Sequence, residues 1–382
     1  MESNANRQLE TLLQKRKDKL LFRSLKDSSG LIDFCSNDYL GFSTLGILKN
    51  ALDKQEENNS KSKLYGATGS RLISGNSREH EALEVYLAEF YQREAALLFN
   101  SGYDANLGLY SALPQKNDLV LFDELCHASI RDGLKMCRGK SLSFPHNDLE
   151  ALETHLQYNS DKYAQIYVAT ESVFSMDGDF APLKELVKLK EKYAFELLLD
   201  EAHATGIFGK NGQGRAVELN LHNEIFASVH TFGKALGAHG AVVLGGQILK
   251  QFLINFSRPF IFTTALPLSS VKAIKTAHDI LSNEDCKLNE ISTLRNLLKV
   301  EIEAIPNAEL ILSESQIQSL LIPGNERAKA VASALEETGI YAKAILYPTV
   351  PKGKERIRIC LHEFNTIAEI NLLCKTLKEA LK

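Results

Sequence analysis

Short apolar runs that alternate with helical patterns constrain the fold of this chain more than any other feature. Between most of the runs, apolar residues recur at helical spacing, as in APLKELVKLKEKYA. Strands that alternate with helices predict a mainly parallel sheet with helices on both faces, and such sheets bind ligands at the carboxyl ends of their strands. The runs are AALLFNSG, DLVLFDE, QIYVATES, FELLLDEAH, EIFASVHTFG and GAVVLGG.

The pattern changes near residue 268. Long helical stretches follow, and then short strand-like pieces such as SLLIP and ERIRICL. A chain of 382 residues is long enough for two domains. We therefore expect an N-terminal helical segment (1–36), a large α/β domain (37–268) and a smaller C-terminal α+β domain (269–382).

Composition excludes several classes of partner. The formal net charge is -4, without a basic stripe, which argues against a nucleic-acid partner. The charged N-terminus lacks the apolar core of a signal peptide, and no apolar run is long enough for a membrane span. The cysteines are scattered without a C-x-x-C pair, so neither a metal site nor a disulfide framework is expected. These features predict a cytoplasmic protein without a membrane partner.

The stretch from Asp200 to Lys234 carries the strongest chemical signal. Asp200 ends an apolar run, His203 lies on the turn beyond it, and Lys234 lies within TFGKALG. Pyridoxal 5'-phosphate (PLP) needs an amine for a Schiff base and a carboxylate that keeps its ring nitrogen protonated. Lys234 alone would be interpreted as a solvated surface lysine. The pair in this order, each residue in a glycine-flanked context, favours a PLP site.

A second motif could bind the phosphate of this cofactor. Ser101-Gly102-Tyr103 follows a strand-like run and opens a predicted helix, where backbone N–H groups and the helix dipole attract an anion. By itself the motif is weak, because S-G-x is a common helix start. The hydroxyls of Thr231 and Ser175 could add donors, or both residues could simply belong to turns.

His127 follows the run DLVLFDE, again at the predicted ligand-binding edge. A histidine at this position could stack on an aromatic cofactor and bond to a substrate carboxylate. It could equally be a polar loop histidine with a local backbone partner. The histidines other than His127 and His203 lack such a context.

The order of the motifs resembles one family along nearly the whole chain. By the sequence and order of these motifs, the chain is similar to the α-oxoamine synthases. These are fold-type I PLP-dependent transferases that condense a small amino acid with an acyl thioester and release carbon dioxide. The resemblance implies a homodimer with shared active sites. The motifs are SNDYLGFS, YGATGSRLISGN, NSGYDAN, DELCHASIRDG, TESVFSMDGDFAPL, LDEAHATGIFG, TFGKALGAHGA and RPFIFTTALP.

The resemblance also implies roles around the cofactor. It assigns Lys234 to the Schiff base, Asp200 to the pyridine nitrogen, His203 to the phenolic oxygen and His127 to stacking over the ring. Further cofactor contacts are implied, and the last of them would reach the phosphate of a neighbouring subunit: Gly102, Tyr103, Ser175, Thr231 and Thr264.

For the substrates, the resemblance implies two pairs of residues. Asn37 and Arg358 match positions that hold the carboxylate of the amino acid, and Arg23 and Thr349 match positions near the acyl substrate. Many family members carry a longer, hairpin-like insertion before SNDYLG, which this chain lacks.

The motifs leave several reactions possible, both within this family and outside it. GSRLISGN, TFGKALGAHGA and FIFTTALP are most similar to the branch that joins L-alanine to a pimeloyl thioester, carried by coenzyme A or by an acyl carrier protein, in biotin synthesis. Sister reactions join glycine to acetyl-CoA or succinyl-CoA, or serine to a long acyl-CoA. An aminotransferase and a non-catalytic partner subunit are further alternatives. The second usually lacks the Schiff-base lysine, which is present here as Lys234.

Overall fold

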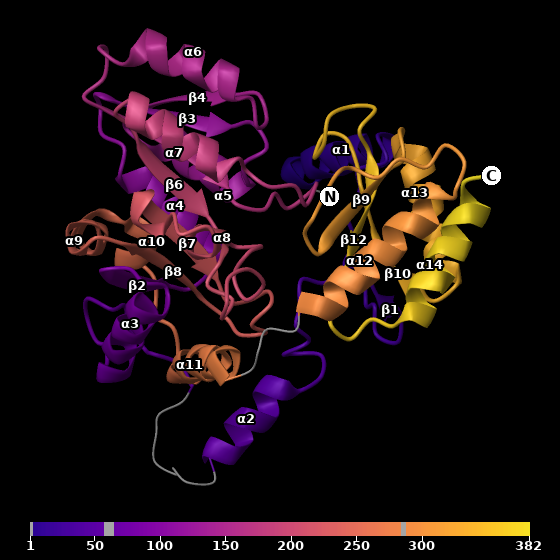
Figure 1. Cartoon of the computed structure of the whole chain (residues 1–382), viewed down its shortest axis with the longest axis horizontal. Helices are drawn as coiled ribbons and strands as arrows, with labels where there is room; N and C mark the ends of the chain where they lie inside the picture. Colours follow the sequence, from indigo (N-terminus) through magenta and orange to yellow (C-terminus); the bar gives the residue numbers. More distant parts are fainter. Residues whose placement is uncertain (1–2, 57–64, 284–287) are drawn as a thin grey trace. The chain divides into compact units, whose positions relative to one another are not determined.

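The chain forms two compact units in the computed structural model, which describes residues 3–56, 65–283 and 288–382 (Figure 1). Unit 1 is built from three separate stretches, Met1–Ser36, Met176–Gly178 and Asn289–Lys382. Unit 2 is built from two, Asn37–Ser175 and Asp179–Leu288.

Unit 2 is built on a seven-stranded sheet with the order β2-β8-β7-β6-β5-β3-β4. Only β8 is antiparallel to its neighbours β2 and β7, and the other pairs are parallel. The predicted mainly parallel sheet is thus confirmed. The strands are β2 (Ala95–Phe99), β3 (Asp118–Asp123), β4 (Lys140–Phe144), β5 (Gln165–Glu171), β6 (Glu196–Asp200), β7 (Ile225–Thr231) and β8 (Ala241–Gly245).

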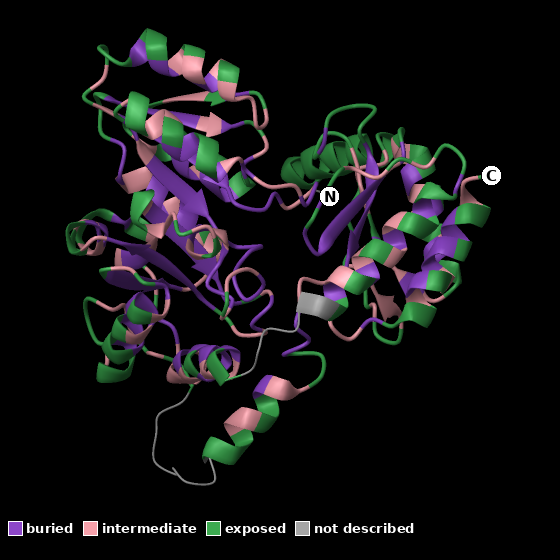
Figure 2. Ribbon diagram, in the orientation of Figure 1, coloured by how far each residue is buried: buried purple, intermediate pink, exposed green. Residues whose placement is uncertain are grey.

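Helices cover both faces of this sheet, because successive side chains of a strand point to opposite faces. Val120 of β3 packs on one side with α4 (Gly102–Ala112), α5 (Ala128–Met136), α9 (Gln247–Phe256) and α10 (Arg258–Ile261). Its neighbours Leu119 and Leu121 pack on the other side with α6 (Leu149–Asn159), α7 (Leu183–Lys192) and α8 (Arg215–Glu218). Figure 2 shows the central strands as almost wholly buried. Because these strands are buried on both faces, their sequences are continuous apolar runs.

Three helices of unit 2 pack together beside the sheet: α2 (Ile47–Glu56), α3 (Arg78–Phe90) and α11 (Leu268–Asn283). The hydroxyl of Tyr91, which follows α3, lies 3.0 Å from Nε2 of His278 on α11. A short 3-10 helix, η1 (His222–Glu224), precedes β7. The helix α11 therefore belongs to unit 2, whereas the sequence placed the start of the small domain at residue 269.

Unit 1 contains a three-stranded antiparallel sheet with the order β11-β12-β9 and a parallel pair, β1 with β10. Helix α13 packs against β10, β11 and β12, and α13 and α14 lie side by side (Figure 1). The strands are β1 (Ile32–Asp33), β9 (Ile317–Leu321), β10 (Ile340–Tyr341), β11 (Lys343–Ile345) and β12 (Arg356–Cys360). The helices are α1 (Asn4–Asp18), α12 (Leu288–Glu303), α13 (Asn325–Glu337) and α14 (Ile367–Ala380).

The N-terminal segment packs with the C-terminal part of the chain. Ile32 of β1 pairs with Ile340 of β10, and Phe34 is fully buried in the apolar core of unit 1. The predicted boundary after residue 36 coincides with a unit boundary. The segment is part of unit 1 rather than a separate region, because Phe34 and Ile32 pack in the core of that unit, although α1 itself has no buried residue.

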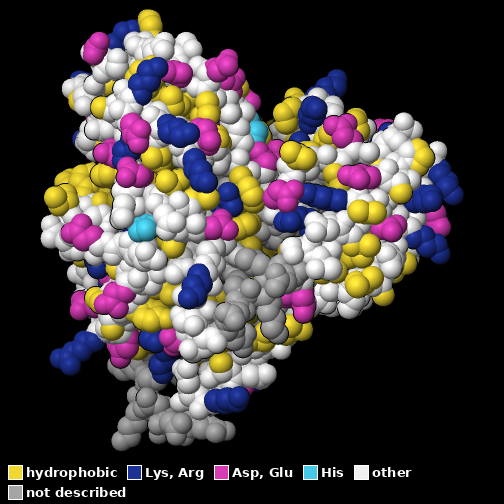
Figure 3. All heavy atoms as spheres, viewed as in Figure 1, with side chains coloured by type: hydrophobic (Ala, Val, Ile, Leu, Met, Phe, Trp, Pro, Cys, Tyr) yellow, Lys and Arg dark blue, Asp and Glu magenta, His cyan; other side chains and the backbone are white. Residues whose placement is uncertain are grey.

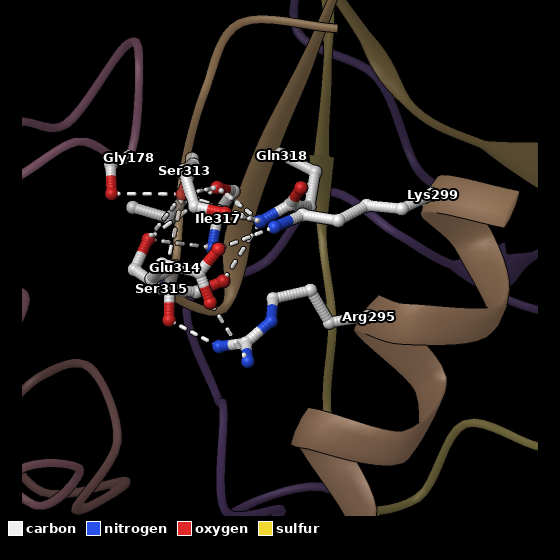
Figure 4. Close-up of polar contacts among 8 residues, drawn as sticks. All are labelled: Gly178, Arg295, Lys299, Ser313, Glu314, Ser315, Ile317 and Gln318. Carbon is white, nitrogen blue, oxygen red and sulfur yellow. Dashed lines mark hydrogen bonds and ion pairs between the residues drawn. The ribbon is translucent and has the colours of Figure 1, made fainter. Parts of the chain in front are cut away.

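The short stretch Met176–Gly178 separates the two stretches of unit 2 in the sequence. By its contacts it belongs to unit 1. Figure 4 shows Ser313 close to Gly178 and Ile317, and its hydroxyl oxygen lies 2.9 Å from the carbonyl oxygen of Gly178 and 2.8 Å from that of Ile317. Gly178 has a φ of +78°, and a Cβ there would lie 2.1 Å from the carbonyl oxygen of Ile317. Glycine is therefore required at this position.

The strand β4 (Lys140–Phe144) was not among the runs recognised in the sequence. It lies at the edge of the sheet beside β3, and most of its residues are only partly buried. An edge strand with the sequence KSLSF lacks the continuous apolar run of a central strand. The sequence pattern therefore gave no signal for it.

The surface of the described residues carries mixed charge. On the face drawn in Figure 3, basic and acidic side chains are interspersed. Within the described ranges, no helix combines the length and the hydrophobicity that crossing a membrane requires.

Candidate active site at the carboxyl ends of the strands

A cavity of about 280 Å³ lies in unit 2 where three neighbouring strands end. Glu171 ends β5, Asp200 ends β6 and Thr231 ends β7, and all three line this cavity. The position agrees with the general rule for ligands of parallel sheets. Eight of the residues singled out in the sequence meet here: Asn37, Gly102, Tyr103, His127, Asp200, His203, Thr231 and Lys234.

Asp200 is a buried carboxylate with two N–H donors. Its Oδ2 accepts from Nδ2 of Asn106 at 2.7 Å, and its Oδ1 accepts from the backbone N–H of Ala202 at 2.8 Å. Hydrogen bonds from N–H groups stabilise negative charge on a carboxylate. The sheet and α4, which carries Asn106, therefore hold a fixed negative group at the cavity wall.

Lys234 belongs to a chain of polar contacts that runs along the cavity. Its Nζ lies 2.8 Å from Nε2 of His203, and Nδ1 of His203 lies 2.7 Å from the hydroxyl of Tyr39. The Tyr39 hydroxyl in turn donates to Oδ1 of Asn37 at 2.9 Å. Since His203 and Tyr39 are both buried, this chain fixes the lysine amine relative to Asn37.

His127 is held by both its backbone and its ring. It is the N-cap of α5, where its Nδ1 accepts from the backbone N–H of Ser129 and lies 2.7 Å from the Ser129 hydroxyl. Its backbone N–H donates to Oε1 of Glu171 at 2.5 Å. Burial lowers the pKa of His127, which favours the neutral imidazole. A neutral ring with a fixed orientation can pack against an aromatic ligand.

The N-terminus of α4 also faces the cavity. Ser101 is the N-cap, and the first N–H groups of a helix have no partner within the helix. A Cβ at Gly102 would lie 2.3 Å from Cγ2 of Thr231, so any other residue would displace the Thr231 side chain. The Tyr103 hydroxyl donates to Asp132 at 2.7 Å, and this hydrogen bond raises the pKa of Tyr103.

Two residues of unit 2 that the sequence connected with the cofactor do not line this cavity. Ser175 lies in the loop after β5, and Thr264 lies in the segment after α10. The backbone carbonyl of Thr264 accepts from Nδ2 of Asn100 at 2.8 Å. Their roles toward a cofactor remain predictions.

The other three candidates belong to unit 1. Arg23 and Thr349 line the same groove, which has a volume of about 950 Å³ and runs beside α13, β10 and β11. Its walls combine apolar side chains such as Leu346 with basic ones such as Lys329. Arg358 lies on the central strand β12 and is buried.

Sequence reasoning missed several residues of the cavity and its surroundings: Tyr39, Asn106, Ser129, Glu171 and His239. All five lie inside motifs that were recognised, SNDYLG, NSGYDAN, DELCHASIRDG, TESVFSMDGD and TFGKALGAHGA. Only Glu171 carried a signal of its own, because it ends a strand-like run as Asp200 does. Tyr39 and Asn106 act through partners that are distant in the sequence, His203 and Asp200.

The residues of this cavity fit PLP. They offer a primary amine on Lys234, a buried carboxylate on Asp200 and a helix N-terminus for a phosphate. Oδ1 of Asn106 is buried and has no hydrogen-bond partner among the described residues, as expected for a wall that contacts a polar ligand. The volume is close to the lower end for small-molecule sites, about 300 Å³.

Comparisons with known proteins agree with this assignment. Residues 29–377 match the model of the family "Aminotransferase class I and II". An 8-amino-7-oxononanoate synthase of Emericella nidulans is 38% identical over 405 residues, which cover 97% of this chain and 94% of the relative.

Solved structures show the same likeness. A serine palmitoyltransferase of S. paucimobilis, solved with a bound PLP–myriocin aldimine, is 28% identical and superposes with a TM-score of 0.86. The match covers 99% of this chain and 98% of that one. An 8-amino-7-oxononanoate synthase of Francisella tularensis is 29% identical with a TM-score of 0.76, over 93% of this chain and 98% of that one.

The family match and the full-length relatives identify the class of enzyme. The fold is that of the fold-type I PLP-dependent enzymes, which agrees with the sheet of unit 2. Its cofactor is PLP, and its activity is that of an acyltransferase. The chain therefore belongs to the aminotransferase class I and II family, as a PLP-dependent enzyme of the α-oxoamine synthase type.

Proposed function

We propose that the chain is an 8-amino-7-oxononanoate synthase, which condenses L-alanine with a pimeloyl thioester and releases carbon dioxide. The observation that carries this proposal is the full-length similarity to curated relatives of that name, at 38% to 40% identity. The motifs GSRLISGN and FIFTTALP support the same branch of the family. The thioester carrier is coenzyme A or an acyl carrier protein.

PLP, when bound, supplies an aldehyde that takes up an amine and a pyridinium ring that delocalises the electrons left on the amino-acid Cα. Lys234 would hold the aldehyde carbon through Nζ, and its free amine would be the base that removes the Cα proton and later returns one. Asp200 holds the proton on the pyridine nitrogen, and its two N–H donors keep its carboxylate in place.

The two histidines orient the ring and the lysine. We assign His203 to the phenolic oxygen, because its Nε2 already lies 2.8 Å from Nζ of Lys234. We assign His127 to the face of the ring, where its neutral imidazole can pack without adding charge. Gly102, Tyr103 and Thr231, which line the cavity, complete the proposed cofactor site, with the phosphate at the N-terminus of α4. Ser175 is assigned to the cofactor by the family resemblance alone.

Two polar groups are proposed for the carboxylate of alanine. Asn37 lines the cavity and accepts a hydrogen bond from the Tyr39 hydroxyl, which in turn contacts His203. Arg358 is assigned to the same carboxylate by the family resemblance, and a guanidinium can bind a carboxylate through two parallel hydrogen bonds. A fixed carboxylate sets which bond at Cα stands perpendicular to the ring, and so which bond breaks.

The groove of unit 1 suits the acyl substrate. Arg23 and Thr349 both line it, which supports their assignment to this substrate. An apolar wall with basic side chains fits a pimeloyl chain, since that chain is apolar along its length and ends in a carboxylate. A charged hydrogen bond from Arg23 to this carboxylate would stabilise binding by roughly 1.5 to 3 kcal/mol.

A second candidate is condensation of serine with a long acyl thioester. The observation that favours it is the likeness to serine palmitoyltransferase structures over almost the whole chain, with TM-scores of 0.86 and 0.84. An enzyme discriminates only weakly between acyl chains of similar length, because one methylene changes the binding free energy by roughly 1 to 3 kcal/mol. The sister enzyme 2-amino-3-ketobutyrate CoA ligase uses glycine and acetyl-CoA and belongs in the same test.

The decisive experiment combines each amino acid with each thioester. Purified protein loaded with PLP is incubated with alanine, glycine or serine and with pimeloyl, acetyl, succinyl or palmitoyl thioesters, and products are identified by mass. We expect the highest kcat/KM for alanine with a pimeloyl thioester. If serine with palmitoyl-CoA gives the highest value, the second candidate is correct and the biotin assignment is wrong.

We further propose an isologous homodimer in the cytoplasm. The basis is the resemblance of Thr264 to a position that reaches the phosphate of a neighbouring subunit. Sedimentation velocity of the active protein tests this proposal. A monomer with full activity would contradict it.

A further inference from the structure

Two carboxyl groups lie side by side at the end of the sheet in unit 2. Glu171 ends β5 and Asp200 ends β6, and the two residues are register partners across these parallel strands. Both line the cavity, and their exposed fractions are only 2% and 4%. Two negative charges in such a position repel each other strongly, because little water screens them.

The hydrogen bonds of the two groups differ. Asp200 accepts two N–H donors, one on each oxygen. Among the described residues, Glu171 accepts one, from the backbone N–H of His127 to Oε1. Hydrogen bonds of this kind favour the ionised form. When two carboxyls share a site, one of them has a strongly raised pKa, and the smaller number of donors makes Glu171 that group.

We propose that Glu171 is a protonated carboxylic acid in the resting site, so that Asp200 alone carries the negative charge next to the pyridine nitrogen. Glu171 is then a positioning residue with two tasks. It holds His127 through the backbone N–H, and it keeps a second negative charge out of the cavity. This inference rests on the PLP site, and it is independent of which amino acid and thioester react.

The electrostatics of the surrounding groups support the proposal. Burial, followed by the charge of Asp200, raises the pKa of Glu171 to about 8. The charge of Lys234 and the N–H of His127 act in the opposite direction but are weaker. The titratable and charged groups that face Glu171 from the surrounding elements are Asp123, Asp200, Lys234, His127, Cys126 and Tyr110.

A consequence follows for the affinity of the cofactor. Above about pH 8 Glu171 loses its proton, and the cavity then contains two carboxylates. PLP is an anion because of its phosphate, so a second negative charge weakens its binding. The variant Glu171→Gln keeps an acceptor for the His127 N–H but has no proton to lose, so this loss of affinity disappears.

The test measures the Kd of PLP for the apoprotein between pH 6.5 and 9.5, by absorbance or fluorescence. We expect E171Q to bind within about threefold of the natural protein at pH 7 and about tenfold more tightly at pH 9.5, which corresponds to a pKa shift of about one unit. The titration of PLP itself affects both proteins equally and cancels in their ratio. A ratio that stays constant across this pH range would overturn the proposal.

Two control variants separate the charge from the hydrogen bond. Glu171→Met loses both, so it should weaken PLP binding at every pH, without the alkaline transition. Glu201→Gln removes the charge of a neighbouring buried carboxyl, which accepts from Ser172 and the Ala216 N–H and does not line the cavity. It should keep the alkaline transition of the natural protein. Loss of the transition in E201Q would overturn the assignment to Glu171.

Infrared spectroscopy observes the proposed proton directly. A protonated carboxylic acid gives an infrared C=O band that a carboxylate lacks. We expect this band in the apoprotein at pH 7, its loss near pH 8 and its absence from E171Q. A spectrum at pH 7 that is the same for the natural protein and folded E171Q would contradict a proton on Glu171.

Discussion

The cavity of unit 2 and the groove of unit 1 differ in how their polar groups are held. In the cavity, Asp200 and His203 are buried and have hydrogen-bond partners from other parts of the chain. In the groove, Arg23 and Thr349 are exposed. Buried, hydrogen-bonded groups cannot change without leaving a partner unsatisfied, whereas exposed side chains can. On our proposal, the cavity carries out the common chemistry of the family, and the groove selects the acyl substrate.

The largest expected effect is that of Lys234→Ala, which removes the proposed base. We expect kcat to fall by about 10³-fold or more, because both the covalent attachment and the proton transfer are lost. The measurement is product formation, together with borohydride reduction and peptide mapping of the natural holoenzyme. Lys210→Ala, at an exposed loop position, is the matched control and should keep full activity. A pyridoxyl label on another lysine would refute this assignment.

Asp200→Asn should rank second. The amide keeps the shape of the side chain but loses the negative charge that holds the pyridine proton. Exchange of the alanine Cα proton for deuterium, followed by NMR, should slow by about 10²- to 10³-fold, while PLP binding changes much less. Normal exchange in this variant would mean that the cavity does not work as we propose.

The third prediction concerns His146 and the pH dependence of the free energy of unfolding. Burial lowers the pKa of His146, but hydrogen bonds to Asp123 and Asp179 outweigh it and raise the pKa to about 9. A histidine with a pKa above its unfolded value stabilises the fold below about pH 6.5 and loses this contribution as pH rises through 9. His146→Gln should thus lower the free energy of unfolding by on the order of 3 kcal/mol at pH 6, and much less above pH 9.

Urea unfolding of the apoprotein at several pH values measures this difference. The control is His155→Gln, since the His155 side chain forms no ion pair among the described residues. Its effect should not depend on pH in this way. A cost of His146→Gln that is equal at pH 6 and pH 9.5 would show that His146 is not a charged link between the two carboxylates.

The smallest expected effect belongs to the groove. Arg23→Ala should raise the KM for the pimeloyl thioester by about 10- to 100-fold, as one charged hydrogen bond is lost. Exchange of the alanine Cα proton should stay unchanged, since that step needs only the cavity. The comparison variant is Lys329→Ala, which removes another basic side chain of the groove. A loss of Cα exchange in Arg23→Ala would break the proposed division between cavity and groove.

Much of the fold was predictable because it follows from local patterns. Central strands that are buried on both faces must be apolar along their length, so the runs that end at Asp200 and Glu171 were visible in the sequence. The edge strand β4 was not, because only one of its five residues is fully buried. The place of α11 in unit 2 and of Phe34 in the core of unit 1 depended on long-range packing.

The sequence by itself determined the chemistry of the site, since an acid at a strand end and a glycine-flanked lysine in this order have few other uses. Only the tertiary structure decided which groups surround them. Asn106 reaches Asp200 across 94 positions of the chain, and Tyr39 reaches His203 across 164. Such contacts depend on strand order and register, which packing selects. For the same reason, the pairing of Glu171 with Asp200 emerged only when β5 and β6 were found side by side.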